Sequence, residues 1–137
     1  MNHNVISVFI YGSLLPGQAN HHVVSNRMIA ARPGRIVGRL VDVGAYPALI
    51  RDESAFREER YVRGMWIDVT ESGLQGMDQL EDFGGIEESN DYDRIWTADA
   101  DCSEQCGWVY IWDSPRGCPP IMEQYWPEFC KNRMAAE

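Results

Sequence analysis

A short apolar run near the N-terminus, Val5 to Tyr11, sets the strongest limit on how this chain can fold. The run is almost entirely apolar, β-branched or aromatic, which predicts a strand buried inside a sheet. It leads directly into Gly12-Ser13-Leu14, and Pro16-Gly17 marks a turn shortly afterwards. Such a glycine-containing loop can aim several backbone N–H groups at one point, as a site for a carboxylate or an oxyanion requires.

The rest of the sequence predicts more strands than helices and no regular alternation of the two. Apolar and alternating runs predict the strands, and the charged stretch 52–60 is predicted as an exposed loop. This pattern favours an α+β fold, a small mixed or antiparallel β-barrel of about six strands with flanking short helices, over a doubly wound sheet. The predicted strands are 5–11, 35–43, 48–51, 61–69, 93–100 and 108–112, and the predicted helices are 21–30, 73–83 and 119–133.

Length and charge limit the classes of function. The 137 residues, 45% of them hydrophobic, fit one domain spanning 1–137. A formal net charge of −9 disfavours nucleic acid as a partner and favours cationic ligands, although an acidic surface also serves solubility alone. No run is long and apolar enough for a membrane span, and the first residues do not resemble a signal peptide. We therefore expect no membrane partner and a cytoplasmic location.

The cysteines and histidines do not form a pattern of metal ligands or nucleophiles. The four cysteines contain no CxxC pair, and all three histidines lie far from them in the sequence. We therefore expect no metal, no cofactor and no cysteine nucleophile. Reduced thiols are the expectation, although Cys102 and Cys106 flank a predicted hairpin tip, where they can approach each other.

One acidic residue is predicted on the apolar face of a helix. At about 100° per residue, a helix over 73–83 places Glu81 between Leu74 and Met77. Burial of a carboxyl group raises its pKa, which suits a general acid/base near neutral pH. Two alternatives remain open: Glu81 forms a buried ion pair, for instance with Arg94, or the helix is rotated and Glu81 is exposed.

Seven short motifs occur in a characteristic order along about residues 5 to 112. They are Tyr11-Gly12-Ser13-Leu14, Gly17-Gln18-Ala19-Asn20-His21, Gly44-Ala45-Tyr46-Pro47, Val62-Arg63-Gly64, Met77-Asp78-Gln79-Leu80-Glu81, Tyr92-Asp93-Arg94 and Gly107-Trp108-Val109-Tyr110. Each motif is weak by itself. Their order and spacing together resemble the gamma-glutamylcyclotransferase-like family, also called the AIG2-like family.

This resemblance implies a compact β-barrel with a cavity between the Tyr11–Leu14 loop and the helix of Glu81. It implies an enzyme that releases 5-oxoproline and a free amine from a small gamma-glutamyl amide, without metal or cofactor. Glu81 would be the catalytic acid/base. The substrate would be bound by Tyr11, Gly12, Ser13, Leu14 and Tyr92.

Several of these residues have a purely structural interpretation as well. Tyr11 and Tyr92 can line the core, Gly12 can simply relieve a turn, and Ser13 can cap the backbone locally. The tryptophans are predicted as core residues. At the level of function, the alternative is a noncatalytic small-ligand-binding or interaction protein that uses the same barrel pocket.

The stretch 82–91 is long and acidic. If it borders the site, it favours a leaving amine that carries positive charge, such as a polyamine or an amino sugar, through salt-sensitive attraction. A solvated loop without a role in binding is the alternative.

Overall fold

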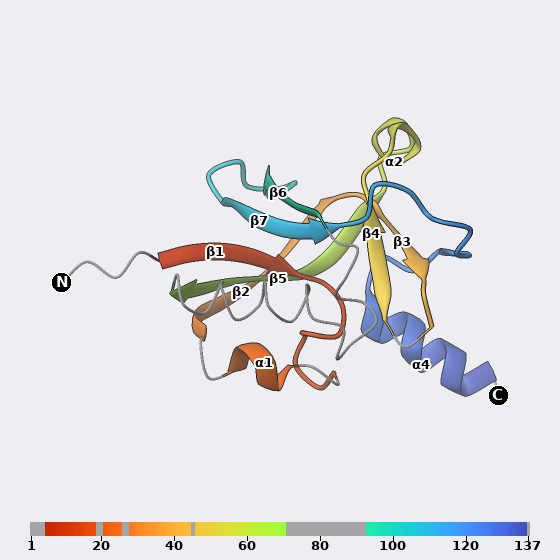
Figure 1. Cartoon of the computed structure of the whole chain (residues 1–137), viewed down its shortest axis with the longest axis horizontal. Coiled ribbons are helices and arrows are strands. Elements are labelled where there is room, and N and C mark those ends of the chain that lie inside the picture. Colours follow the sequence, from red (N-terminus) through yellow and green to blue (C-terminus); the bar gives the residue numbers. More distant parts are fainter. Residues whose placement is uncertain (1–4, 19–20, 26–27, 45, 71–92, 137) are drawn as a thin grey trace.

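The computed structural model describes residues 5–18, 21–25, 28–44, 46–70 and 93–136 (Figure 1). Within these residues the strands form two sheets. The larger sheet has the strand order β2-β5-β1-β7-β6, and the smaller one has the order β4-β3-β8. The strands are β1 (Val5–Ile10), β2 (Met28–Val37), β3 (Arg39–Asp42), β4 (Pro47–Ile50), β5 (Tyr61–Thr70), β6 (Asp93–Ala98), β7 (Cys106–Ile111) and β8 (Pro120–Ile121).

Strand β1 is the middle strand of the larger sheet, antiparallel to β5 and parallel to β7. Val8 and Ile10 belong to the apolar cluster on one face of the sheet, and Phe9 belongs to the cluster on the other face. All three side chains are at most 2% exposed. The predicted buried strand is confirmed, because a strand with neighbours on both sides and packing on both faces needs a continuous apolar run.

The predicted barrel is not closed. Strands β2 and β6 stand at opposite edges of the larger sheet among the described residues. The two sheets meet through a bridge between Ile50 and Trp112, and the N–H of Trp112 donates to the carbonyl of Leu49 at 3.0 Å. The α+β class and the mostly antiparallel pairing are confirmed.

The first helix is shorter than predicted. Helix α1 covers only His22–Ser25, and Met28 already begins β2, where the pattern predicted helix up to residue 30. Strand β2 pairs with β5 from Met28 to Val37, so that long-range pairing overrides the local preference. Pro33 is tolerated within β2 because an edge strand has a partner on one side only.

The stretch 52–60 is not simply a loop, because it contains helix α2 (Glu53–Arg57). The carboxylate of Asp52 accepts a hydrogen bond from the N–H of Ala55 at 3.0 Å and so caps the first turn. The same carboxylate pairs with Arg39 at 2.7 Å. The hydrogen bond from Arg39 holds the pKa of Asp52 below its usual value, so the cap stays charged.

The C-terminal helix begins later than predicted. Pro120 and Ile121 form β8, which pairs with Val41 and Leu40 of β3. Helix α4 (Trp126–Ala136) follows, and the side chain of Trp126 is 1% exposed in the cluster that also contains Phe9. The proline pair therefore starts a short strand and not a helix. The helix predicted over 73–83 lies outside the described residues.

Three further features concern the described part of the chain. It contains no group of three or more His, Cys, Asp or Glu residues that could hold a metal ion. None of its helices is long and apolar enough to cross a membrane. All four cysteines are free thiols, including the predicted hairpin pair Cys102 and Cys106.

Candidate active site

The loop after β1 begins with a tyrosine that is tied to two other strands. The hydroxyl of Tyr11 donates a hydrogen bond to the carbonyl of Tyr110 on β7 at 2.7 Å. The same hydroxyl accepts a hydrogen bond from the N–H of Leu49 on β4 at 3.3 Å. The Tyr11 side chain is 6% exposed, so it joins the larger sheet to the smaller sheet from inside the core. A direct contact between Tyr11 and the substrate stays a prediction.

Gly12 lies against the corner between β3 and β4. A Cβ atom at Gly12 would lie 2.8 Å from two ring carbons of Pro47, so only glycine fits there without a shift of the loop. The corner itself needs Gly44, whose φ is 121° and whose N–H donates to the carboxylate of Asp42 at 2.8 Å. Two motifs that are far apart in the sequence therefore meet at this point.

Two backbone N–H groups of this loop have no hydrogen-bond partner among the described residues. The N–H of Leu15 closes a turn by donating to the carbonyl of Gly12 at 3.0 Å. Within the described part of the chain, the N–H groups of Gly12 and Leu14 have no hydrogen-bond partner, although both residues are buried. Buried N–H groups are normally paired. Two unpaired donors in one turn can bind a carboxylate or a carbonyl oxygen that gains negative charge.

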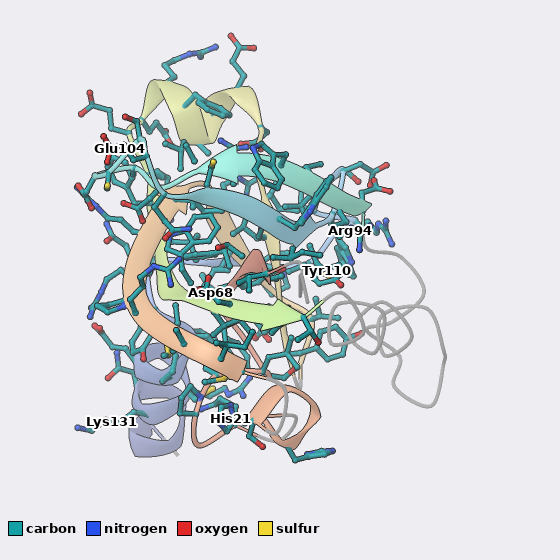
Figure 2. The ribbon with its side chains drawn as sticks, turned by 90° about the vertical axis from the view of Figure 1, so that its left-hand side faces the viewer. His21, Asp68, Arg94, Glu104, Tyr110 and Lys131 are labelled. Carbon is teal, nitrogen blue, oxygen red and sulfur yellow. The ribbon has the colours of Figure 1, made fainter. Side chains whose placement is uncertain are left out.

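His21 holds the other end of this loop. Its Nδ1–H donates to the carbonyl of Leu14 at 2.8 Å (Figure 2 shows His21 beside α1). The side chains of Leu14 and Leu15 are buried in the cluster that contains Val8 and Ile10. The loop is thus held by the buried side chains of Leu14 and Leu15 and by the hydrogen bond from His21 to its backbone. The sequence predicts no role for His21, and only its place in the motif 17–21 points to it.

The predicted acid/base and one predicted binding residue, Glu81 and Tyr92, lie outside the described residues. The next residue in the chain, Asp93, is paired with Ile111 at the end of β7. This is the end of the sheet at which the carbonyl of Tyr110 accepts the Tyr11 hydroxyl. Ser13 is half-buried within the loop, and its predicted contact with the substrate stays a prediction.

Arg94 lies at the same end of the sheet. It is paired across the β6–β7 ladder with Tyr110, and Figure 2 shows the two side by side. Its guanidinium carbon lies 4.9 Å from the ring centre of Trp108, which is a cation–π distance. A pair between Arg94 and Glu81, the structural alternative from the sequence, falls outside the described residues.

The largely buried carboxylates in the described part of the chain are already engaged. Burial raises the pKa of Asp99, but hydrogen bonds from the Trp66 indole and from three backbone N–H groups outweigh burial and lower it overall. Asp68 behaves likewise, since Arg32 at 3.1 Å and the Ser7 hydroxyl at 2.7 Å offset its burial and lower its pKa. Both groups are charged and paired at neutral pH, which makes them structural acceptors and poor general bases.

A surface hollow of about 380 Å³ lies elsewhere. It is lined by Arg63, Met122, Glu123, Gln124 and Glu128. No residue of the loop 11–14 takes part in its lining. We place the candidate site at the loop, where the N–H groups of Gly12 and Leu14 have no partner among the described residues, and not at this hollow.

Comparison with known proteins relates this arrangement to one family. The sequence model of the family described as gamma-glutamyl cyclotransferase, AIG2-like, matches residues 8–128. A protein of Niallia circulans named gamma-L-glutamyl-butirosin B gamma-glutamyl cyclotransferase is 33% identical over 110 residues. The match covers 78% of this chain and 67% of that relative.

Solved structures show the same fold. YkqA from Bacillus subtilis has a TM-score of 0.73 at 19% identity, with 96% of this chain and 43% of that chain covered. An AIG2-like protein from Mus musculus has a TM-score of 0.59 at 24% identity, with 93% of this chain and 84% of that chain covered. The family match runs from β1 through the loop to the start of α4, so this chain belongs to the gamma-glutamyl cyclotransferase, AIG2-like family of enzymes.

Proposed function

We propose that this enzyme releases 5-oxoproline and a free amine from a small gamma-glutamyl amide. Glu81 is the general acid/base in this proposal, and the loop 11–14 with Tyr92 binds the glutamyl group. Membership of the family supports the type of reaction. The relative from Niallia circulans supports it as well, since its name states a gamma-L-glutamyl compound as the substrate.

The reaction is an intramolecular aminolysis. The α-amine of the glutamyl group attacks its own γ-carbonyl carbon, which forms a C–N bond and closes a five-membered ring. The bond from that carbon to the leaving nitrogen then breaks. A base takes one proton from the α-ammonium group before the attack, and the ring nitrogen gives up a second proton as the lactam forms. One of these protons goes to the leaving nitrogen, which departs as a neutral amine, and the other goes to solvent or to the free amine. One carboxyl group can accept and donate these protons in turn, so the reaction needs no enzyme nucleophile and no second substrate.

The observation that carries the proposal is the pair of unpaired N–H groups at Gly12 and Leu14, within the described residues. They can bind the α-carboxylate of the glutamyl group or the oxygen of the attacked carbonyl. The loop is held in place by the Tyr11 hydroxyl and by the Pro47 ring. Donors that are fixed before the substrate arrives favour the ring-closing geometry of a flexible glutamyl chain.

The sequence supports Glu81 as the proton carrier. Helical spacing puts it between Leu74 and Met77 on an apolar face, and it stands in the motif that resembles the family's acid/base segment. The described carboxylates Asp68 and Asp99 do not compete for this role, since the pKa of each is lowered by its hydrogen bonds. A carboxyl group that shuttles a proton near neutral pH needs a raised pKa.

The charge of the chain favours a leaving amine that is itself cationic. The net charge is −9, and the stretch 82–91 is rich in acidic residues. Attraction of this kind is screened by salt, so the KM for a cationic gamma-glutamyl amide should rise with ionic strength while that for a neutral amide stays nearly constant. Equal salt dependence of the two KM values would remove the cationic preference from the proposal.

The first experiment is mass spectrometry of the products formed from a mixed panel of gamma-glutamyl amines, peptides and amino acids. Wild type should release 5-oxoproline, and the amide that disappears identifies the substrate. Glu81→Gln keeps the size of the side chain but cannot carry the proton, and should lower kcat by about 100-fold or more.

Glu53→Gln is the matched control for this variant. Glu53 is an exposed residue of α2, and its replacement should leave kcat as in wild type. Release of glutamate in place of 5-oxoproline would show hydrolysis by water and contradict the proposal. Equal kcat values for Glu81→Gln and wild type would remove Glu81 from its assigned role.

A further inference from the structure

Two tryptophans on β6 and β7 form a pair at the edge of the core, one partly buried and one exposed. Trp66, Trp112 and Trp126 are at most 6% exposed, as predicted for core residues. Trp96, in contrast, is 56% exposed. Its ring meets that of Trp108 edge to face, with ring centres 5.1 Å apart. The two residues are direct cross-strand partners, so the pair is held by the register of the sheet.

This pair lies on the face of the sheet that carries the candidate loop. Trp108 packs against the cluster that contains Leu14, Leu15 and Tyr110. Cross-strand partners share a face, so Trp96 stands on that face too. Strand β6 is two positions from β1 in the sheet, about 10 Å at the usual strand spacing, and Trp96 is level with Val8 of β1 because both are in register with Trp108.

The same surface continues to the end of the sheet where the loop begins. Arg94 precedes Trp96 by two residues and therefore shares its face. Its guanidinium stacks on Trp108 at 4.9 Å from the ring centre. Arg94 is paired with Tyr110, whose carbonyl accepts the Tyr11 hydroxyl at 2.7 Å. The aromatic surface and the loop are thus joined through Tyr110, with no other strand between them.

We propose that Trp96, packed on Trp108, forms a platform for the leaving amine of the substrate, and that this amine carries a ring with an apolar face. The inference rests on the proposed function, because it places the leaving group relative to the glutamyl group at the loop. An indole offers a flat face to the C–H groups of a sugar ring and to an aromatic ring alike. The edge-to-face contact with Trp108 holds the Trp96 ring in position, so little conformational freedom is lost when a ligand ring stacks on it.

The test compares three amides that differ only in the leaving amine: gamma-glutamyl-methylamide, gamma-glutamyl-benzylamide and the gamma-glutamyl amide of glucosamine. Wild type should show a higher kcat/KM for at least one ring amide than for the methylamide. In Trp96→Ala that ratio should fall by roughly three- to tenfold, the effect expected for one lost ring contact. Trp96→Tyr keeps a ring and should recover most of the ratio. The ring amide that is affected tells an aromatic from a sugar leaving group.

Ile29→Ala is the matched control. Ile29 is also 56% exposed, but it lies on β2 at the opposite edge of the sheet. Its replacement should leave the ratio between ring amides and methylamide as in wild type. An unchanged ratio in Trp96→Ala, or an equal fall in Ile29→Ala, would overturn the platform.

A binding experiment separates this inference from the proposed function. The indole N–H signals of the tryptophans are followed by NMR during titration with gamma-glutamyl-benzylamide and with the glucosamine amide, and Trp96→Tyr identifies the signal of Trp96. A selective shift of the Trp96 signal without release of 5-oxoproline would support the platform and contradict the cyclotransferase reaction. Release of 5-oxoproline from either ring amide while the Trp96 signal stays in place would support the reaction and overturn the platform. If neither a shift of the Trp96 signal nor release of 5-oxoproline were observed, the platform and the cyclotransferase reaction would both be overturned.

Discussion

The two ends of the β6–β7 hairpin differ in how the nearby hydrogen-bonding groups are paired. At the hairpin end, the carboxylate of Asp99 is 8% exposed and accepts four hydrogen bonds of 2.9 to 3.0 Å. The donors are the Trp66 indole and the backbone N–H groups of Arg35, Asp101 and Cys102. At the other end, next to Tyr110, the N–H groups of Gly12 and Leu14 have no partner among the described residues.

This difference separates a structural polar site from a candidate functional one. An unpaired buried N–H costs about 1–3 kcal/mol, so two N–H groups in one turn without a partner among the described residues do not contribute to the stability of the fold. Around Asp99, in contrast, four donors share one carboxylate.

The largest effect on stability is expected from Asp99→Ala. The change leaves four donors without an acceptor and should lower the free energy of unfolding by about 3–5 kcal/mol. Urea denaturation measures this. Asp101→Ala is the control, because Asp101 pairs with Arg35 on the exposed surface and its loss should change the stability far less than the loss of Asp99. Equal losses in the two variants would contradict the structural role of Asp99.

Gly12→Ala should act on the loop and its contact with Pro47. The new methyl group would lie 2.8 Å from the Pro47 ring, so the loop must move, at a cost of about 1–3 kcal/mol in stability. A loop displaced by about 1 Å should also lose roughly 100-fold in kcat/KM. The double variant Gly12→Ala with Pro47→Ala removes the opposing ring and should recover part of both losses. If neither stability nor kcat/KM recovered in the double variant, the effect of Gly12→Ala would not arise from its contact with Pro47.

Tyr11→Phe should cost less, about 1–2 kcal/mol, since it removes one hydroxyl and leaves the ring in place. The N–H of Leu49 and the carbonyl of Tyr110 lose this partner, so the loop is held less firmly. We expect a lower kcat with little change in KM if Tyr11 only positions the loop. A rise in KM alone would show direct contact with the substrate. Tyr61→Phe, on the half-buried start of β5, serves as the control.

The smallest expected effect is on the stability of the fold at acidic pH. The pKa of Asp99 is lower in the folded protein than its ordinary value of 3.8, because hydrogen bonds to the carboxylate outweigh its burial. The stability that this charge contributes is fully present above pH 3.8 and is lost as the pH falls through the lower, folded-state value. The urea midpoint of wild type should therefore fall more steeply in acid than that of Asp99→Asn. Parallel curves for the two proteins would contradict this.

Part of the fold could be predicted because it depends on local pattern. The run Val5–Ile10 is apolar at every position but one and became the central strand. The hairpin of β6 and β7 followed from alternation and a polar tip. The helix predicted over 21–30 was wrong from Met28 onward, because pairing with β5 decides the state of residues 28 to 37. A local pattern carries no information about such a partner.

For the candidate site, the sequence determined the Gly12 turn, the order of the family motifs and Glu81 as the residue to test. Only the tertiary structure decided how the loop is held, since Tyr11 is joined to a residue 99 positions away and Gly12 is packed against Pro47. It also decided which tryptophans are buried and that Trp96 is not. The reason is physical: the conformation of a turn follows from its own residues, whereas its anchors and the exposure of a side chain depend on which distant strands become neighbours.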